Sequence, residues 1–219
     1  MKEFDGIYLS WCSGINTGRK IIGVLKKHDD GRFTFAYDQE EVEKAKAEGF
    51  LPYTELPNTK IEYNGTILDV FAQRLMKSVR TDISTFYDFW EIEPQYTHDK
   101  YYLLAHTQGL LPTDNFELLA DYNPVSGLHF LTDLTRLSQE HLPANTVMIG
   151  DTLTFTLDTG NKFDDKAVKV FKGEKEIGYI KRVHSRVFHK EGAEKIQLKV
   201  KAVDQNGEIK RIFVKVFIS

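Results

Sequence analysis

The C-terminal third of the chain carries the pattern that most restricts its fold, because several short segments there have the composition of β-strands. Residues 151–158 alternate leucine and phenylalanine with threonine, which is the period of a strand with one buried face. Residues 196–204 and 208–218 flank Asn206-Gly207, a dipeptide typical of a tight hairpin turn. This part is therefore expected to fold mainly as antiparallel sheet. Its remaining expected elements are strands at 167–171 and 176–180 and a short helix at 182–190.

The N-terminal half mixes strand and helix patterns. Apolar runs separated by turn-forming residues predict three strands that form a small meander, at 7–11, 21–25 and 32–37. Apolar residues at helical spacing and good helix formers predict helices at 39–48, 66–76, 82–91 and 99–106. Thr66 and Asp69 have the spacing of a capping box at the start of the second helix. The expected fold class is α+β, with a small β-meander and helices followed by a β-rich domain.

A domain boundary is expected at residues 123–127, which read Asn-Pro-Val-Ser-Gly and cluster turn-forming residues. The charge changes sign at this point. Residues 1–127 hold 13 basic and 20 acidic residues, a net charge of −7, whereas 128–219 hold 16 basic and 12 acidic residues, a net charge of +4. We therefore expect two domains, 1–124 and 128–219, of which only the second has the charge of a polyanion binder.

Several classes of protein are excluded by what the sequence lacks. No apolar run has the roughly 18 to 20 residues of a membrane span, and the first residues are acidic where a signal peptide is basic. The single cysteine, Cys12, allows no internal disulfide and no cysteine-based zinc site. We expect a cytoplasmic protein with no membrane association, no cofactor and no metal.

Two segments resemble catalytic motifs without matching them. In residues 13–20 only three residues separate Gly14 from Gly18, and no Ser or Thr follows to hold magnesium, so a glycine turn explains the segment better than a phosphate-binding loop. Asp151, Asp164 and Lys166 are compatible with a metal-dependent nuclease. Aspartate is also common in turns, and a role in turns explains these residues better than a nuclease site does.

The predicted final hairpin combines cations and aromatic rings. Gln197, Lys199 and Lys201 share one face of its first strand, and Phe213, Lys215 and Phe217 share a face of its second. Lysines that neutralise phosphates beside rings that stack on bases suit single-stranded nucleic acid. A solvated strand face whose phenylalanines pack under a neighbouring element fits the same pattern.

Residues 128–218 resemble the HIRAN domain, a small β-barrel related to OB-folds. Three segments carry the resemblance in the family's order and spacing. They are Gly-Asp-Thr-Leu-Thr-Phe at 150–155, Gly-Asn-Lys-Phe-Asp-Asp-Lys-Ala-Val-Lys-Val at 160–170, and Glu-Ile-Gly-Tyr-Ile-Lys-Arg at 176–182. The resemblance implies non-enzymatic DNA binding with a preference for single-stranded 3′ ends.

The resemblance also implies which side chains bind DNA. Asp164 would accept a hydrogen bond from a terminal 3′-hydroxyl, and Phe163 would stack on a base. The other residues that fall at the family's phosphate-binding or groove-lining positions are Arg136, Asn161, Tyr179 and Arg182. Three positions depart from the family pattern. Lys162 replaces the usual proline, Leu137 stands where a second stacking aromatic is common, and Phe163 stands where tyrosine is common and so lacks its hydroxyl.

The first half resembles the N-terminal subdomain of HipA-type kinases, through segments that include Gly-Arg-Phe-Thr-Phe-Ala-Tyr-Asp at 31–38 and Leu-Leu-Ala-His-Thr-Gln-Gly at 103–109. Nothing in the chain resembles the kinase core, so kinase activity is not implied. The acidic half is expected to dock a protein partner. An alternative of another class is a regulatory subunit, for example of a HipA-type kinase toxin system, that binds protein and not DNA.

Overall fold

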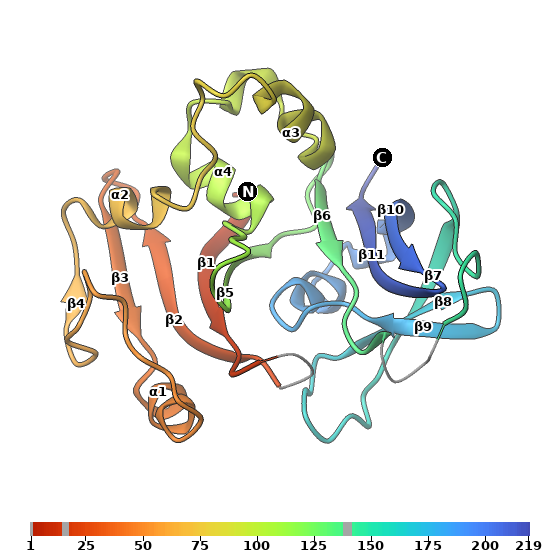
Figure 1. The fold of residues 1–219 in the computed structure, drawn as a ribbon, viewed down its shortest axis with the longest axis horizontal. Helices are drawn as coiled ribbons and strands as arrows, with labels where there is room; N and C mark the ends of the chain where they lie inside the picture. Colours follow the sequence, from red (N-terminus) through yellow and green to blue (C-terminus); the bar gives the residue numbers. More distant parts are fainter. Residues whose placement is uncertain (1, 15–17, 138–141) are drawn as a thin grey trace. The chain divides into compact units, whose positions relative to one another are not determined.

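The computed structural model describes residues 2–14, 18–137 and 142–219. They form two compact units, Phe4–Ala120, and Asp121–Ser219 together with the residues up to Glu3 (Figure 1). The mixed α+β fold expected from the sequence is confirmed. The chain passes from one unit to the other at Ala120, a few residues before the turn-rich segment 123–127.

The first unit is built on a five-stranded sheet in the order β4-β3-β2-β1-β5, in which β1 to β4 pair antiparallel. The strands are β1 (Phe4–Trp11), β2 (Lys20–Lys27), β3 (Phe33–Tyr37), β4 (Glu62–Tyr63) and β5 (Phe116–Tyr122). The expected meander is present as β1, β2 and β3, whereas β5 was not expected as a strand. Side chains of the central strands form the core and are fully buried, among them Ile7, Leu9, Ile22, Leu25 and Phe35.

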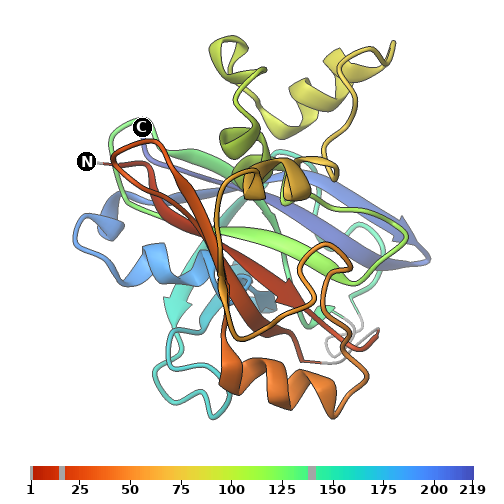
Figure 2. The same cartoon turned by 90° about the vertical axis from the view of Figure 1, so that its left-hand side faces the viewer.

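The helices of this unit are α1 (Gln39–Lys46), α2 (Ile67–Ala72), α3 (Ile83–Trp90) and α4 (Lys100–Thr107), with a 3₁₀ turn η1 (Pro94–Tyr96). Asp38 caps α1 by accepting a hydrogen bond from the Glu41 N–H at 3.0 Å, as its position before the helix predicts. Helix α1, orange in Figure 2, packs against β2 through the fully buried Val42 and Ala45.

The capping box expected at Thr66 and Asp69 is wrong. Thr66 makes no side-chain hydrogen bond to the helix, and its backbone (φ −81°, ψ 19°) lies outside the extended region that a capping residue needs. Asp69 instead pairs with Lys100 at 2.6 Å. The helix is accordingly short and ends at Ala72, before the expected end at residue 76.

The second unit contains a six-stranded sheet in the order β6-β11-β10-β7-β8-β9, which curls into a half-barrel. Its strands are β6 (His129–Asp133), β7 (Thr152–Leu157), β8 (Val168–Lys172), β9 (Lys175–Tyr179), β10 (Gln197–Asn206) and β11 (Glu208–Phe217). The expected hairpin at Asn206-Gly207 is confirmed, with Gly207 in the left-handed region (φ 71°). The helix expected at 182–190 is a 3₁₀ helix, η2 (His184–His189), and a second one, η3 (Ala193–Lys195), precedes β10.

A backbone bridge brings the two ends of this sheet together. Thr135, beyond β6, donates to the Tyr179 carbonyl at 2.8 Å and accepts from the Tyr179 N–H at 3.1 Å. The bridge passes directly over Gly178, where a Cβ atom would lie 2.7 Å from the Thr135 carbonyl oxygen. The sheet therefore curls this tightly only because residue 178 has no side chain.

A buried cluster of charges joins β6, β11 and the segment after β9. The Asp133 carboxylate pairs with Lys181, which is 2% exposed, and with the Arg211 Nε at 2.9 Å. Burial alone would raise the pKa of Asp133, but the charges of Lys181 and Arg211 outweigh it and lower that pKa to about 2. Asp133 is therefore ionised at neutral pH and holds two cations.

No helix in the described part of the chain is long and apolar enough to span a membrane.

Candidate nucleic-acid interface

The loop between β7 and β8 carries three of the six residues that the resemblance assigns to DNA binding. It is closed at its base by a hydrogen bond from the Asp158 N–H to the Ala167 carbonyl at 2.9 Å. Within it, the Lys166 N–H donates to Asp164 Oδ1 at 3.0 Å. Such side-chain bonds to the backbone two residues on are how aspartate stabilises turns. Asp164 is thereby fixed in a defined loop conformation.

Asn161 organises this loop from inside. Its Oδ1 accepts from the backbone N–H groups of Phe163 and Asp164, at 3.0 and 3.2 Å, and its Nδ2 donates to Asp158 Oδ2 at 3.0 Å. The Tyr179 hydroxyl donates to the same Asp158 oxygen at 3.2 Å. The side chain of Asn161 is thus used to hold the loop, and Asp158 links that loop to Tyr179 on β9.

The protonation states of this linkage are set by its own hydrogen bonds. The Asn161 amide, together with Tyr179 and Lys169, lowers the pKa of Asp158, so its carboxylate is ionised at neutral pH. Burial, followed by the charge of Glu176, raises the pKa of Tyr179, so its hydroxyl stays protonated and can donate. Both effects favour the same ordered loop.

Arg136, Phe163 and Tyr179 lie together at the outer end of the loop. The Phe163 side chain is 78% exposed, an unusual position for a large apolar ring. The Arg136 guanidinium lies 5.5 Å from the centre of the Phe163 ring and 4.9 Å from that of Tyr179, within the range of cation–π attraction. Arg136 itself follows the end of β6 and adopts a left-handed backbone (φ 65°). The cluster presents an exposed ring beside a cation.

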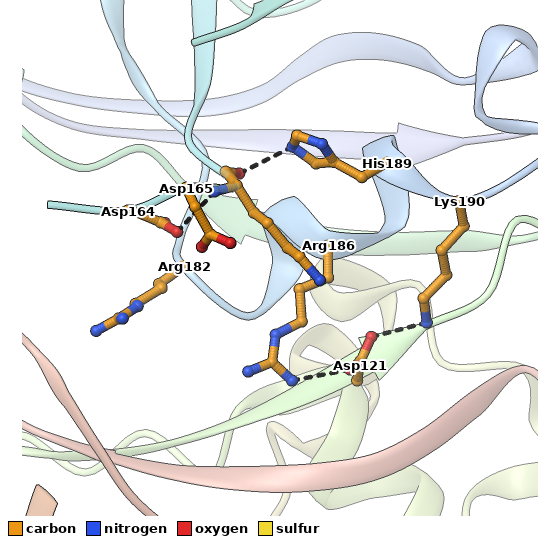
Figure 3. A pocket seen from close by; sticks show the side chains of 8 residues that line it. Asp121, Asp164, Asp165, Arg182, Arg186, His189 and Lys190 are labelled. Atoms are coloured by element: carbon orange, nitrogen blue, oxygen red, sulfur yellow. Dashed lines mark hydrogen bonds and ion pairs between the residues drawn. The ribbon is translucent and has the colours of Figure 1, made fainter. Parts of the chain in front are cut away.

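Asp164 and Arg182 line a hollow of about 310 Å³ (Figure 3). The remaining lining residues are Asp121, Asp165, Lys166, Arg186, His189 and Lys190. They come from the loop, from β5 and from η2 with its C-terminal end. A hydrogen bond at 3.1 Å between His189 Nε2 and the Lys166 carbonyl ties η2 to the loop.

The cations of this hollow fall into two groups. Arg186 and Lys190 both pair with Asp121, at 2.9 and 2.8 Å, as the dashed lines of Figure 3 show. The Lys166 ammonium and the Arg182 guanidinium form no ion pair with any residue that the structure describes, and in Figure 3 Arg182 extends away from Asp121. These two cations are therefore the ones available to an anionic ligand.

The other sequence-derived candidates do not join this site. The Asp151 carboxylate accepts from the Met148 N–H at 2.9 Å and pairs with Lys172 at 2.5 Å, and it does not line the hollow that contains Asp164. Leu137 is 6% exposed, so the position of the family's second stacking ring is buried here. Residues 15–17 of the glycine segment 13–20 lie outside the described residues. Within the described residues no three His, Cys, Asp or Glu side chains are grouped so that they could hold a metal ion.

Several residues of the site were not predicted from the sequence. Asp158 looks like an ordinary turn residue, although it links Asn161 to Tyr179. Arg186, His189 and Lys190 have the i, i+3, i+4 spacing of one helical face, and this spacing was the available signal. No sequence signal pointed to Asp121, because its partners Arg186 and Lys190 lie 65 and 69 residues further along the chain.

Comparison with known proteins adds little to this geometry. No family model matches the chain, and no curated protein matches it. Among solved structures, the crystal structure of a structural genomics target from Lactobacillus plantarum is similar to part of it, at 17% identity and a TM-score of 0.34. The match covers 43% of this chain and 96% of that one.

Proposed function

We propose that the second unit binds single-stranded DNA without catalysis and prefers a free 3′-hydroxyl end. The observation that carries the proposal is the exposed Phe163, held beside Arg136 and Tyr179, next to a hollow in which Lys166 and Arg182 have no ion-pair partner among the described residues. An exposed ring stacks on a base of any identity, and the free cations neutralise phosphates. The resemblance to the HIRAN domain supports the same function.

Asp164 is the side chain that we propose distinguishes an end from the interior of a strand. One of its oxygens, Oδ1, accepts from the Lys166 N–H, which leaves Oδ2 for a ligand. A carboxylate accepts a hydrogen bond from a hydroxyl but repels a phosphate. At this position a free 3′-hydroxyl is therefore favoured over a 3′-phosphate or a continuing strand.

The Asp164→Asn variant is expected to lose this discrimination. The amide oxygen can still accept from the Lys166 N–H, so the loop should keep its conformation, while the negative charge that repels phosphate is gone. We expect the preference for a 3′-hydroxyl over a 3′-phosphate to fall about tenfold. Fluorescence anisotropy with short single strands that differ only at this end measures it.

Arg182→Gln is the control for this experiment, because it removes a cation from the same hollow and leaves Asp164 intact. It should weaken the binding of the 3′-hydroxyl and the 3′-phosphate oligonucleotide equally. It should also lower the slope of log affinity against log salt by about 0.7, the value for one phosphate contact on a single strand. An unchanged end preference in Asp164→Asn would refute the role given to the carboxylate.

Phe163→Ala should weaken strand binding by about 1 to 3 kcal/mol, the usual contribution of one stacked base. Because the ring is 78% exposed, its removal should change the free energy of unfolding by less than about 0.5 kcal/mol. Leu157→Ala, which truncates another exposed apolar side chain (43%) on β7, is the matched control and should leave binding unchanged. A large fall in thermal stability with Phe163→Ala would instead assign the ring to packing.

We propose a docking role for the first unit, on the basis of its acidic charge and its resemblance to the HipA-type N-terminal subdomain. The alternative is a protein-binding regulatory subunit that does not bind DNA, and it predicts that none of the single-stranded oligonucleotides binds. Native mass spectrometry of complexes formed by the whole chain separates the two: a stoichiometric protein partner together with no affinity for any strand favours the regulatory subunit.

A further inference from the structure

The strand β11 carries alternating cations and aromatic rings on the face that is turned away from the core. Its inward side chains, Ile212, Val214 and Val216, are fully buried. Antiparallel pairing with β10 places Gln197 opposite Phe217 and Lys199 opposite Lys215, so these four residues share one face. Lys201, which the sequence placed on the same face, falls at a register shift between Val200 and Ala202, and Ala202 is the residue opposite Phe213. We call this surface the hairpin face. Its members are Gln197, Lys199, Arg211, Phe213, Lys215 and Phe217.

Cations and rings are interleaved on the hairpin face. The Arg211 guanidinium lies 4.4 Å from the centre of the Phe213 ring, and the Lys215 ammonium lies 5.5 Å from that of Phe217. Gln197 and Lys199 are exposed, and the rings are half-buried. Neighbouring side chains on one face of a strand are about 7 Å apart. The face thus offers a row along β11 in which a positive charge precedes each ring.

One end of the hairpin face carries two lysines on neighbouring strands. Lys199 lies directly opposite Lys215, and like charges in this position destabilise a sheet. The Lys199 ammonium forms no ion pair with any residue of the described part of the chain. Acidic residues lie at the other end, where Asp204 is opposite Arg211 and Asp133 already holds Lys181 and Arg211. An anion bound over Lys199 and Lys215 would relieve their repulsion.

We propose that the hairpin face is a second nucleic-acid site, which binds the interior of a single strand irrespective of its ends. Lysines that neutralise phosphates, alternating with rings that stack on any base, are the combination that sequence-independent binders of single strands use. None of the six residues belongs to the loop 158–167 or to the hollow beside it. The proposal therefore does not depend on the end recognition proposed for Asp164.

A circular single-stranded oligonucleotide tests the proposal, because it has no 3′ end. The Lys199→Gln/Lys215→Gln double variant should bind the circle about tenfold more weakly at low salt, and its slope of log affinity against log salt should fall by about 1.4 for two phosphate contacts. The matched control is Lys175→Gln/Lys210→Gln, which removes two exposed lysines of the same unit that lie elsewhere on the sheet. It should bind nearly as well as the unaltered chain. Lys199→Arg/Lys215→Arg keeps the charges and should retain binding.

Three outcomes would overturn the proposal. The first is that the unaltered chain fails to bind the circle at low salt. The second is that both glutamine double variants lose binding equally. The third is that polyglutamate binds the face as tightly as the circle does, which would indicate an acidic protein partner. Asp164→Asn separates this site from the first one. It should bind the circle as the unaltered chain does, even if the end preference proposed above proves wrong.

Discussion

Asp133→Asn is expected to lower the free energy of unfolding of the second unit by about 3 to 5 kcal/mol, because it leaves the buried Lys181 ammonium without its counter-charge. Lys181 is 2% exposed and cannot turn to water without unpacking the half-barrel. Arg211 is less affected, since its side chain is 38% exposed. Chemical denaturation followed by circular dichroism measures the loss.

Two further variants separate the buried pair from a general effect of charge. Glu208→Gln breaks the exposed pair with Lys210, whose side chains are 52% and 57% exposed, and should cost at most about 1 kcal/mol. Asp133→Leu/Lys181→Met replaces the buried ions by apolar groups of similar size and should recover much of the stability lost in Asp133→Asn. A cost for Asp133→Asn no larger than that of Glu208→Gln would show that Lys181 is solvated in solution.

The same cluster predicts a dependence of stability on acid. The pKa of Asp133 is lowered in the folded state from its usual value of 3.8 to about 2. The stability that it contributes is therefore fully present above pH 4 and is lost as the pH falls from about 4 through 2. Asp133→Asn should lack this component of the acid unfolding curve, so the two proteins should converge in stability at the acid end.

The sequence predicted the elements whose signals are local. The period-two pattern of residues 151–158 predicted β7, and the Asn206-Gly207 dipeptide predicted the β10–β11 hairpin, although not the two register shifts within it. The turn chemistry of the loop 158–167 was also readable, because Asn161 and Asp164 form bonds only two or three residues away. In each of these cases a residue's partner is a near neighbour in the chain.

Elements whose partners are distant could not be predicted in this way. Strand β5, which was not predicted, is buried along most of its length although it contains Glu117 and Asp121. Their charges are balanced by Arg19 and by Arg186 with Lys190, which are far away in the sequence. Likewise, Arg136 meets Tyr179 only because the backbone bridge closes the half-barrel, and no local pattern indicates such a meeting.

Gly178→Ala should break this link between the fold and the proposed site. Gly178 has φ 142°, and an added Cβ would lie 2.7 Å from the Thr135 carbonyl oxygen and 3.3 Å from Leu137 Cδ2. Both the backbone strain and the clash oppose the Thr135–Tyr179 bridge, so we expect a loss of about 3 kcal/mol in the free energy of unfolding. Any molecules that remain folded must move Arg136 away from Tyr179, which should weaken single-strand binding as well.

Gly173→Ala provides the matched control for Gly178→Ala, because Gly173 also has a left-handed backbone (φ 59°) but has nothing within 4 Å of an added Cβ. It should cost only about 1 kcal/mol, the strain of alanine in that conformation. The difference between the two variants isolates the clash with Thr135. Thermal unfolding and single-strand binding measured on both variants would show whether closure of the half-barrel positions Arg136. Equal losses of stability and of binding in the two variants would mean that the Thr135–Tyr179 bridge is needed neither for the fold nor for binding.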